Sequence, residues 1–275
     1  MKTAKSKILV FLKLSRPFQW HKNVFVLAPL FFSFSFSKEK ILKSLITLIC
    51  FIFASSSVYS LNDVIDYEKD KNHPVKKNRP VASGTISKKE AILFSSSLLL
   101  LSLAIADNIY IKAVIMIYFL LNVVYSLRIK GNTPADIIII SLGFVIRVLA
   151  GGIAISVKPS SWLITCTFFV SLFISAMKRE AETQEQSKIY ETIGLISATL
   201  TIIFFTMYVV VERESYFLLL SIIPVVFGII RYYIVAEQNK GKDPSLLVVD
   251  KQIIGAVILW IIIFVVESIF HPLEQ

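Results

Sequence analysis

Three regularly spaced aspartates are the residues of this chain best suited to chemistry. Asp63, Asp66 and Asp70 stand at i, i+3 and i+7, so on a helix they fall within about 60° of one another on one face. Three carboxylates this close repel one another unless a cation holds them. Hard oxygen ligands beside water suit Mg²⁺, which takes one or two carboxylates and completes its shell with water and phosphate oxygens. The spacing therefore indicates a magnesium site.

A run of basic residues follows the aspartates directly, and it consists of Lys69, Lys71, Lys76, Lys77 and Arg79. Lys and Arg side chains donate to phosphate oxygens, so they suit the far side of a bound diphosphate. A solvated, charged helix end would have a similar composition. The position of the run between two apolar segments favours a binding site over that alternative.

The elements that carry these residues are predicted to be membrane helices. The mean hydropathy is +0.71 and 55% of the residues are hydrophobic, above the roughly 45–50% that is usual in soluble domains. Apolar stretches of about 18–25 residues, long enough to cross a bilayer, recur along the chain. We expect an all-α, polytopic membrane protein with nine spans and a single domain over residues 1–275. The spans are expected at 18–36, 41–62, 90–107, 109–128, 134–156, 161–178, 191–211, 216–236 and 252–270.

The distribution of Lys and Arg predicts the orientation. Basic residues gather before the first span and in alternate loops, above all in the 66–89 loop, while the opposite loops hold few. By the positive-inside rule the N-terminus and the aspartates are cytoplasmic, in a multi-pass protein of the cell membrane. The net charge of +10 follows this topology, so nucleic-acid binding is a poor explanation for it.

Further charged residues fall where a membrane makes them informative. Arg147 lies inside the expected fifth span, and burying an arginine there costs about 2.5 kcal/mol or more. It should therefore face a polar cavity or a partner, although a structural salt bridge is an alternative. Lys178, Arg179, Arg231 and Tyr232 end spans on the expected cytoplasmic side, where Tyr and Arg also serve as interface anchors. Their recurrence on one side favours a cytoplasm-facing polar chamber.

Segments spread along most of the chain resemble the UbiA superfamily of intramembrane prenyltransferases. They are RPFQWHKN at 16–23, NDVIDYEKD at 62–70, HPVKKNRP at 73–80, YS at 125–126, GFVIR at 143–147, KR at 178–179, GIIRY at 228–232 and KDPSLLVVD at 242–250. The resemblance implies a nine-helix UbiA-type bundle and a Mg²⁺-dependent transferase. Each segment is unspecific alone, whereas their joint spacing is specific.

One departure from the general superfamily pattern bears on the subgroup. Aromatic prenyltransferases of this fold carry a second aspartate-rich motif after the sixth span, but here residues 178–188 contain no aspartate. Basic side chains at this place fit a substrate with extra phosphate. The chain is most similar to the branch that transfers the phosphoribosyl group of 5-phosphoribosyl-1-diphosphate to a polyprenyl (decaprenyl-type) phosphate, a precursor step in arabinan and cell-wall biosynthesis.

The resemblance also implies roles for individual residues. Asp63, Asp66 and Asp70 would act in catalysis and, with Asn62, hold Mg²⁺, while Lys76 and Arg79 would clamp the diphosphate. Lys178, Arg179 and Arg231 would bind the 5-phosphate or the lipid phosphate, and Arg147 would serve one of these. The remaining implied substrate-binding residues are Lys22, Tyr125, Tyr190 and Tyr232.

Two other functions stay open from the sequence. Transfer of a prenyl group from its diphosphate to an aromatic acceptor shares the fold and the first motif, but would predict aspartates near 178–190. A lipid or ion transporter would often show inverted repeats, and no such internal symmetry is evident. Prenyl chain length and the formation of a homo-oligomer are not determined by the sequence.

Overall fold

The computed structural model describes residues 2–131, 134–182, 187–238 and 250–270, which form helices and turns without a strand. Two compact units are present, and each is described by itself. The first comprises Met1–Ile139 and Ile146–Lys158, and the second comprises Ile140–Val145 and Pro159–Gln275. The all-α prediction is therefore confirmed.

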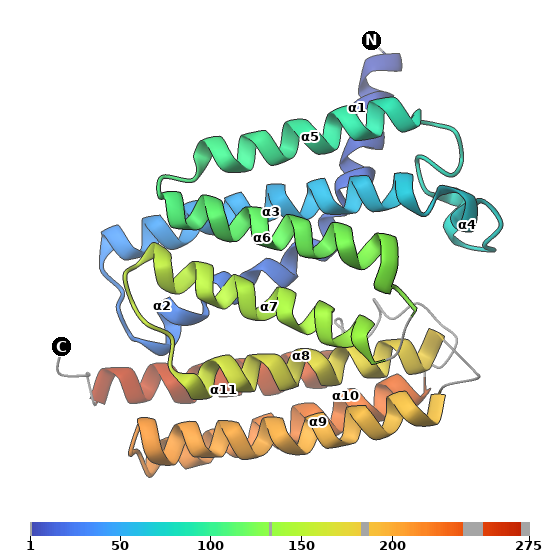
Figure 1. The fold of residues 1–275 in the computed structure, drawn as a ribbon. Helices are drawn as coiled ribbons and strands as arrows, with labels where there is room; N and C mark the ends of the chain where they lie inside the picture. Colours follow the sequence, from blue (N-terminus) through green and yellow to red (C-terminus); the bar gives the residue numbers. More distant parts are fainter. Residues whose placement is uncertain (1, 132–133, 183–186, 239–249, 271–275) are drawn as a thin grey trace. The chain divides into compact units, whose positions relative to one another are not determined.

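The helices follow one another along the chain as Figure 1 labels them. The helices up to residue 158 are α1 Lys2–Ser15, the 3₁₀ helix η1 Pro17–Leu27, α2 Ala28–Phe32, α3 Lys38–Ile65, α4 Tyr67–Lys71, the 3₁₀ helix η2 Lys76–Asn78, α5 Lys88–Ile105, α6 Ile109–Val124, the π-helix η3 Tyr125–Ile129 and α7 Ala135–Ala154. The later helices are α8 Ser161–Glu182, α9 Ser187–Met207, the π-helix η4 Tyr208–Glu212, the 3₁₀ helix η5 Phe217–Ser221, α10 Ile222–Gln238 and α11 Lys251–Phe270.

Helix α3 is the element that positions the aspartates. Its N-terminus is capped by Ser37, whose side chain accepts a hydrogen bond from the backbone N–H of Lys40, and such a cap contributes about 1 kcal/mol. The small side chains of Ser57 on α3 and Ser95 on α5 let the two helices approach each other closely. Ser57 on α3 donates to the backbone carbonyl of Ser95 on α5 at 2.7 Å, so the two helices are joined by a buried hydrogen bond.

The apolar core of the first unit lies along the same helix. Phe51, Ala54 and Val58 of α3 pack in one buried cluster with Ile115 and Tyr118 of α6. The ring centroids of Phe51 and Tyr118 are 5.6 Å apart. Packing on both sides fixes the direction of α3, and hence the place where its last turn and the aspartates emerge.

Seven described helices are long and apolar enough to cross a membrane, so the multi-pass prediction is confirmed and the count of nine spans is not. The expected first span, 18–36, is divided into η1 and the short helix α2. Pro17 and Pro29 each stand at the start of one of these pieces, where proline suits a helix start but not an interior. Helix α5 begins with Lys88, Lys89 and Glu90, which leaves its apolar part short of the roughly 20 residues that a span needs.

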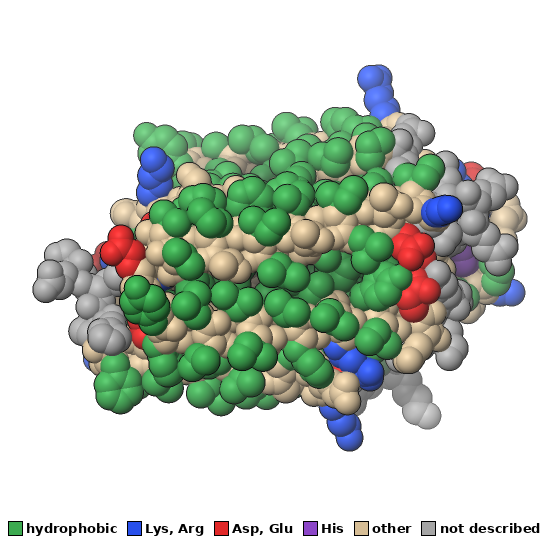
Figure 2. Space-filling view, turned by 90° about the horizontal axis from the view of Figure 1, so that it is seen from below, with side chains coloured by type: hydrophobic (Ala, Val, Ile, Leu, Met, Phe, Trp, Pro, Cys, Tyr) green, Lys and Arg blue, Asp and Glu red, His purple; other side chains and the backbone are tan. Residues whose placement is uncertain are grey.

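In the second unit, α8 and α9 pack closely and α10 packs on α11. A Cβ atom at Gly194 of α9 would lie 2.8 Å from the sulfur of Met177, so a larger residue there would require the Met177 side chain to move. The face shown in Figure 2 is covered mainly by hydrophobic side chains, and its charged side chains gather toward the ends. This distribution is expected for helices that contact lipid.

Candidate functional site

The three aspartates lie at the end of α3 and in the short helix α4. Asp63 is in the last turn of α3, Asp66 stands between the two helices, and Asp70 is in α4. The helix axis breaks at Asp66, whose φ and ψ are −81° and 0°, so the predicted single helix face is interrupted once. All three side chains are nevertheless buried, with 2%, 5% and 4% of each residue exposed.

Each buried aspartate is paired with a basic side chain from a different segment. Arg16 donates to Asp63, and Lys130 donates to Asp66. Arg79 donates to Asp70, and its guanidinium also lies 3.5 Å from the carboxylate of Asp63. Carboxylates removed from water are costly unless they are paired. We call the six residues Asp63, Asp66, Asp70, Arg16, Arg79 and Lys130 the aspartate cluster.

Local backbone structure brings the three basic residues to the cluster. Arg16 joins α1 to η1 in a left-handed conformation with φ 51°, which is uncommon for a residue other than glycine. Its guanidinium also lies 5.3 Å from the centre of the Tyr59 ring. Arg79 ends η2. A left-handed non-glycine residue is typical of a position fixed by its surroundings, here by Asp63 and Tyr59.

The third cation comes from the end of α6, where the chain widens into the π-helical turn η3. The backbone N–H of Lys130 donates to the carbonyl of Tyr125 at 2.9 Å and closes this turn. The Ser126 hydroxyl donates to Oδ1 of Asn62 at 2.7 Å, which ties the turn to α3. Single π turns are frequent at functional sites, and this one aims Lys130 at Asp66.

The donor atoms of the cluster fit Mg²⁺, because buried carboxylate oxygens and a nearby amide oxygen are hard ligands. Among the residues that the structure describes, however, no group of three His, Cys, Asp or Glu side chains is placed to hold a metal ion. Ammonium and guanidinium groups occupy the carboxylates instead. A metal ion therefore has to take the place of these cations rather than enter a preformed cage.

A second polar group of the first unit surrounds Arg147. The Nε atom of Arg147 donates to Oδ1 of Asn23 and its terminal nitrogen donates to the Tyr118 hydroxyl, both at 2.8 Å. The guanidinium lies 4.7 Å from the centre of the Tyr118 ring, and Asn23 in turn donates to Ser55. Arg147 is 4% exposed, so the predicted polar surroundings of this arginine are present. The neighbouring Lys22 is half-buried.

Five further predicted site residues belong to the second unit. Arg231 forms two hydrogen bonds with Asp250, of 3.2 and 2.7 Å, and this guanidinium lowers the pKa of Asp250 to about 2. Tyr232 packs edge-on against Phe173, with ring centroids 5.3 Å apart. Tyr190 is 2% exposed, and Lys178 and Arg179 are half-buried near the end of α8. Their roles in substrate binding stay predictions.

The structure thus brings Arg79 to the aspartates, and its role in binding the diphosphate stays a prediction. Asn62 and Tyr125 lie in the two segments that are joined by the hydrogen bond from Ser126. Lys76 is half-buried in η2. Arg16 and Lys130 are not among the predicted site residues, although Arg16 stands in a segment that carries the resemblance. A single lysine after a span is typical of cytoplasmic loops, so no signal distinguishes Lys130. Residues 242–249 lie outside the described part of the chain.

The fold and the site define a class: an all-helical, multi-pass membrane protein with a buried acidic cluster in its first unit. Comparison with known proteins identifies the family within this class. Residues 26–256 match the model of the UbiA prenyltransferase family. The chain therefore belongs to the UbiA prenyltransferase family, and it is a transferase.

Relatives with curated names agree with this assignment. The chain is 28% identical to a decaprenyl-phosphate phosphoribosyltransferase of Corynebacterium glutamicum, over 95% of this chain and 87% of that protein. It is 29% identical to the protein of the same name from Mycobacterium tuberculosis, over 85% of each chain. For the Mycolicibacterium smegmatis protein of that name the identity is 34%, over 66% of this chain and 59% of the relative.

Solved structures share the fold. A UbiA homolog from Archaeoglobus fulgidus bound to DMAPP and Mg²⁺ has a TM-score of 0.74 at 18% identity, over 93% of this chain and 98% of that one. Digeranylgeranylglyceryl phosphate synthase has a TM-score of 0.68 at 20% identity, over 96% and 99%. The expected UbiA-type fold is confirmed by these similarities.

Proposed function

We propose that this enzyme transfers the 5-phosphoribosyl group of 5-phosphoribosyl-1-diphosphate to a polyprenyl phosphate and releases diphosphate. An oxygen of the lipid phosphate forms the new bond to C1 of the ribose. The bond from C1 to the diphosphate oxygen breaks, and its electron pair leaves with the diphosphate. The names of the relatives support this donor and this acceptor, as does the lack of an aspartate in residues 178–188.

The observation that carries the proposal is the aspartate cluster itself. It combines three carboxylates, suited to a divalent cation, with three basic groups suited to phosphate oxygens. Asp63, Asp66 and Asp70, supported by Asn62, would hold Mg²⁺, and the ion would supply positive charge that stabilises the leaving diphosphate. The acceptor phosphate is already an anion, so no strong general base is required.

The basic residues of the cluster have two sets of partners in this proposal. Without substrate, Arg16, Arg79 and Lys130 neutralise the buried carboxylates. With the donor bound, the same side chains would donate to diphosphate oxygens, which bind Arg and Lys strongly. The cations therefore stay near the reacting bond throughout. Catalysis rests on positioning and electrostatics rather than on proton transfer.

The remaining assignments follow from charge and place. We assign Lys76 to the diphosphate with Arg79, and Lys178, Arg179 and Arg231 to the 5-phosphate or the lipid phosphate. Arg147, which donates to Asn23 of η1 and Tyr118 of α6, would supply positive charge to one of these anions. The site would face the cytoplasm, because the donor is soluble and the acceptor's tail lies in lipid.

A transfer assay with purified protein in detergent tests the proposal. Radiolabelled 5-phosphoribosyl-1-diphosphate and a polyprenyl phosphate are incubated with Mg²⁺, with or without EDTA, and the label in the organic phase is counted. The expected result is label in the lipid fraction that disappears with EDTA. Absence of transfer with several chain lengths, together with consumption of a prenyl diphosphate and an aromatic acceptor, would show the aromatic prenyltransferase function instead.

A further inference from the structure

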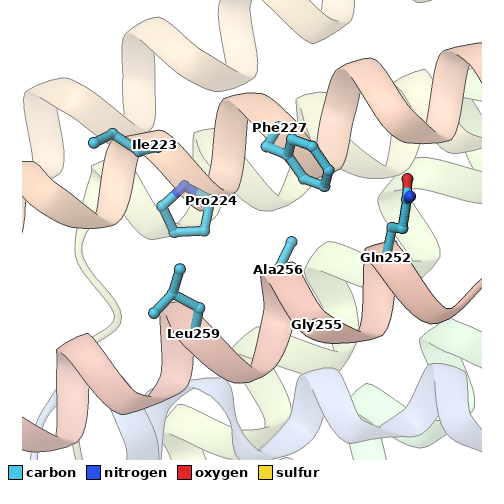
Figure 3. Close-up of a pocket in the computed structure, with 7 residues that line it drawn as sticks. All are labelled: Ile223, Pro224, Phe227, Gln252, Gly255, Ala256 and Leu259. Atoms are coloured by element: carbon cyan, nitrogen blue, oxygen red, sulfur yellow. The ribbon is translucent and has the colours of Figure 1, made fainter.

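An apolar groove runs between the two last helices of the second unit. Its walls are residues of α10 and α11, and its volume is about 410 Å³, within the range of roughly 300–1,000 Å³ that is usual for ligand sites. In Figure 3, Pro224 and Leu259 face each other, and Phe227 and Ala256 project into the same gap. The residues that line the groove are Ile223, Pro224, Phe227, Gln252, Gly255, Ala256 and Leu259.

Gly255 lines the groove beside open space. A Cβ atom built on Gly255 would meet no atom within 4 Å, whereas one built on Gly228 would meet the Cβ of Ala256 at 3.8 Å. The two helices therefore touch at Gly228 and Ala256 and leave open space at Gly255. Gly255 has no positive φ, so a side chain can be introduced there without backbone strain.

One end of the groove carries positive charge. Pro224, Phe227 and Arg231 are spaced as neighbours on one face of α10, so Arg231 follows Phe227 along the groove. Arg231 is bound to Asp250, and the exposed Lys251 comes next in the chain. Among the residues that the structure describes at this end, two basic groups and one carboxylate leave a net charge of +1. Gln252 is the polar member of the lining at the same end.

We propose that this groove binds the isoprenoid chain of the polyprenyl phosphate acceptor, with the lipid's phosphate directed toward Arg231 and Lys251. The proposal rests on the proposed function for the identity of the lipid. Apolar walls in membrane helices match a hydrocarbon chain, and the cationic end matches a phosphate. A single groove with a single cationic end suits a lipid with one chain per phosphate better than a phospholipid with two.

Photoaffinity labelling tests the site independently of catalysis. A polyprenyl phosphate that carries a diazirine in its chain is irradiated with the full-length protein in detergent, and labelled peptides are identified by mass spectrometry. We expect label on the segments 223–227 and 252–259. An excess of unlabelled polyprenyl phosphate should remove the label, and the same excess of phosphatidylglycerol should not. Label confined to other helices, or equal competition by phosphatidylglycerol, would overturn the proposal.

Two substitutions of the same glycine sharpen the test. Gly255→Leu fills the hollow and should lower labelling and the affinity for long-chain polyprenyl phosphate about tenfold, a cost of roughly 1.4 kcal/mol. Gly255→Ala removes the glycine but leaves most of the space, so labelling should persist. Both changes favour the helix, and thermal unfolding of each variant checks its fold. Unchanged labelling of folded Gly255→Leu protein would contradict the proposal.

A short acceptor separates this proposal from the proposed function. Geranyl phosphate has too short a chain to need the groove, so Gly255→Leu should lower transfer to long-chain acceptors through KM and leave geranyl phosphate transfer unchanged. Equal loss with both acceptors would exclude a role of the groove in binding the tail. Absence of transfer to either acceptor in the unsubstituted enzyme would refute the phosphoribosyl transfer, while the labelling result would still decide lipid binding.

Discussion

The aspartate cluster of the first unit and the α10–α11 groove of the second unit differ in almost every physical respect. The cluster is built from buried carboxylates that are paired with half-buried basic side chains, whereas the groove is built from apolar side chains around an open space. A soluble, highly charged donor and a lipid acceptor require these two kinds of surface. In our proposals, the aspartate cluster binds the charged donor through paired charges, and the groove binds the hydrocarbon tail of the acceptor through its shape.

Removal of a carboxylate from the cluster should have the largest effect. Asp63→Asn and Asp66→Asn each keep the side-chain volume but remove a proposed metal ligand and the partner of a half-buried cation. We expect transfer to fall on the order of 100–1,000-fold or more, the usual effect of losing one group that stabilises transition-state charge. Glu68→Gln is a matched control, because Glu68 lies in α4, two residues after Asp66, and its side chain is 80% exposed. Initial rates of phosphoribosyl transfer measure the effect, and near-normal rates in both Asp variants would contradict the metal assignment.

Substitution of Lys130 should separate metal binding from donor binding. Lys130→Met removes the cation that occupies Asp66, so Mn²⁺ binding without substrate, followed by electron paramagnetic resonance, should become tighter. The KM for the donor should rise, because a phosphate ligand has been lost; a charged hydrogen bond contributes about 1.5–3 kcal/mol. Lys89→Met, an exposed position on α5, should change neither value. Weaker Mn²⁺ binding in Lys130→Met would show that this lysine does not compete with the metal.

Loss of a hydrogen bond to Arg147 should lower the stability of the fold, an effect smaller than the loss of activity expected for the aspartate variants. Tyr118→Phe removes the hydroxyl that accepts from the guanidinium at 2.8 Å and leaves a buried donor with one acceptor fewer. This loss should cost about 1–3 kcal/mol, measured as the free energy of unfolding in detergent. Tyr110→Phe, on the same helix and 68% exposed, is the control. Equal stability of the two variants would show that the Tyr118 hydroxyl is not needed to satisfy Arg147.

The ion pair at the end of the groove should have the smallest effect, and its contribution to stability should be lost only in acid. Because Arg231 lowers the pKa of Asp250 to about 2, the pair stabilises the fold fully above the ordinary carboxyl pKa of about 4. This contribution is lost as the pH falls from about 4 toward 2. The difference in Tm between the unsubstituted protein and Asp250→Asn should thus be constant from neutral pH to about pH 5 and shrink below. A difference that shrinks already between pH 7 and about pH 5 would contradict this pairing.

Much of the fold could be predicted because hydropathy is a direct consequence of the membrane. Long apolar runs such as those in α3 and α11 fold as expected. The prediction was less successful where apolar composition and backbone chemistry disagree. Residues 18–36 are apolar enough for a span, but Pro17 and Pro29 divide them into η1 and α2. Proline restricts the backbone whatever the hydropathy of its neighbours. A prediction from hydropathy alone therefore misses the break in this helix.

The site could be predicted only in part for a different reason. The spacing of Asp63, Asp66 and Asp70 is local, so the sequence reveals it. Their partners Arg16 and Lys130 lie 47 and 64 residues away from the carboxylates that they bind, and a single basic residue near a membrane boundary is common. The π turn that aims Lys130 and the left-handed backbone at Arg16 are set by tertiary contacts that no local pattern encodes.

A competition between two donors tests most directly whether the enzyme transfers a phosphoribosyl group rather than a prenyl group. Purified enzyme with Mg²⁺ receives 5-phosphoribosyl-1-diphosphate and a prenyl diphosphate together, with a polyprenyl phosphate and an aromatic acceptor, and the lipid products are identified by mass spectrometry. Our account predicts polyprenyl phosphate enlarged by one phosphoribosyl group, no prenylated aromatic product, and neither product with Asp63→Asn. A prenylated aromatic compound as the main product, with the polyprenyl phosphate unchanged, would contradict it.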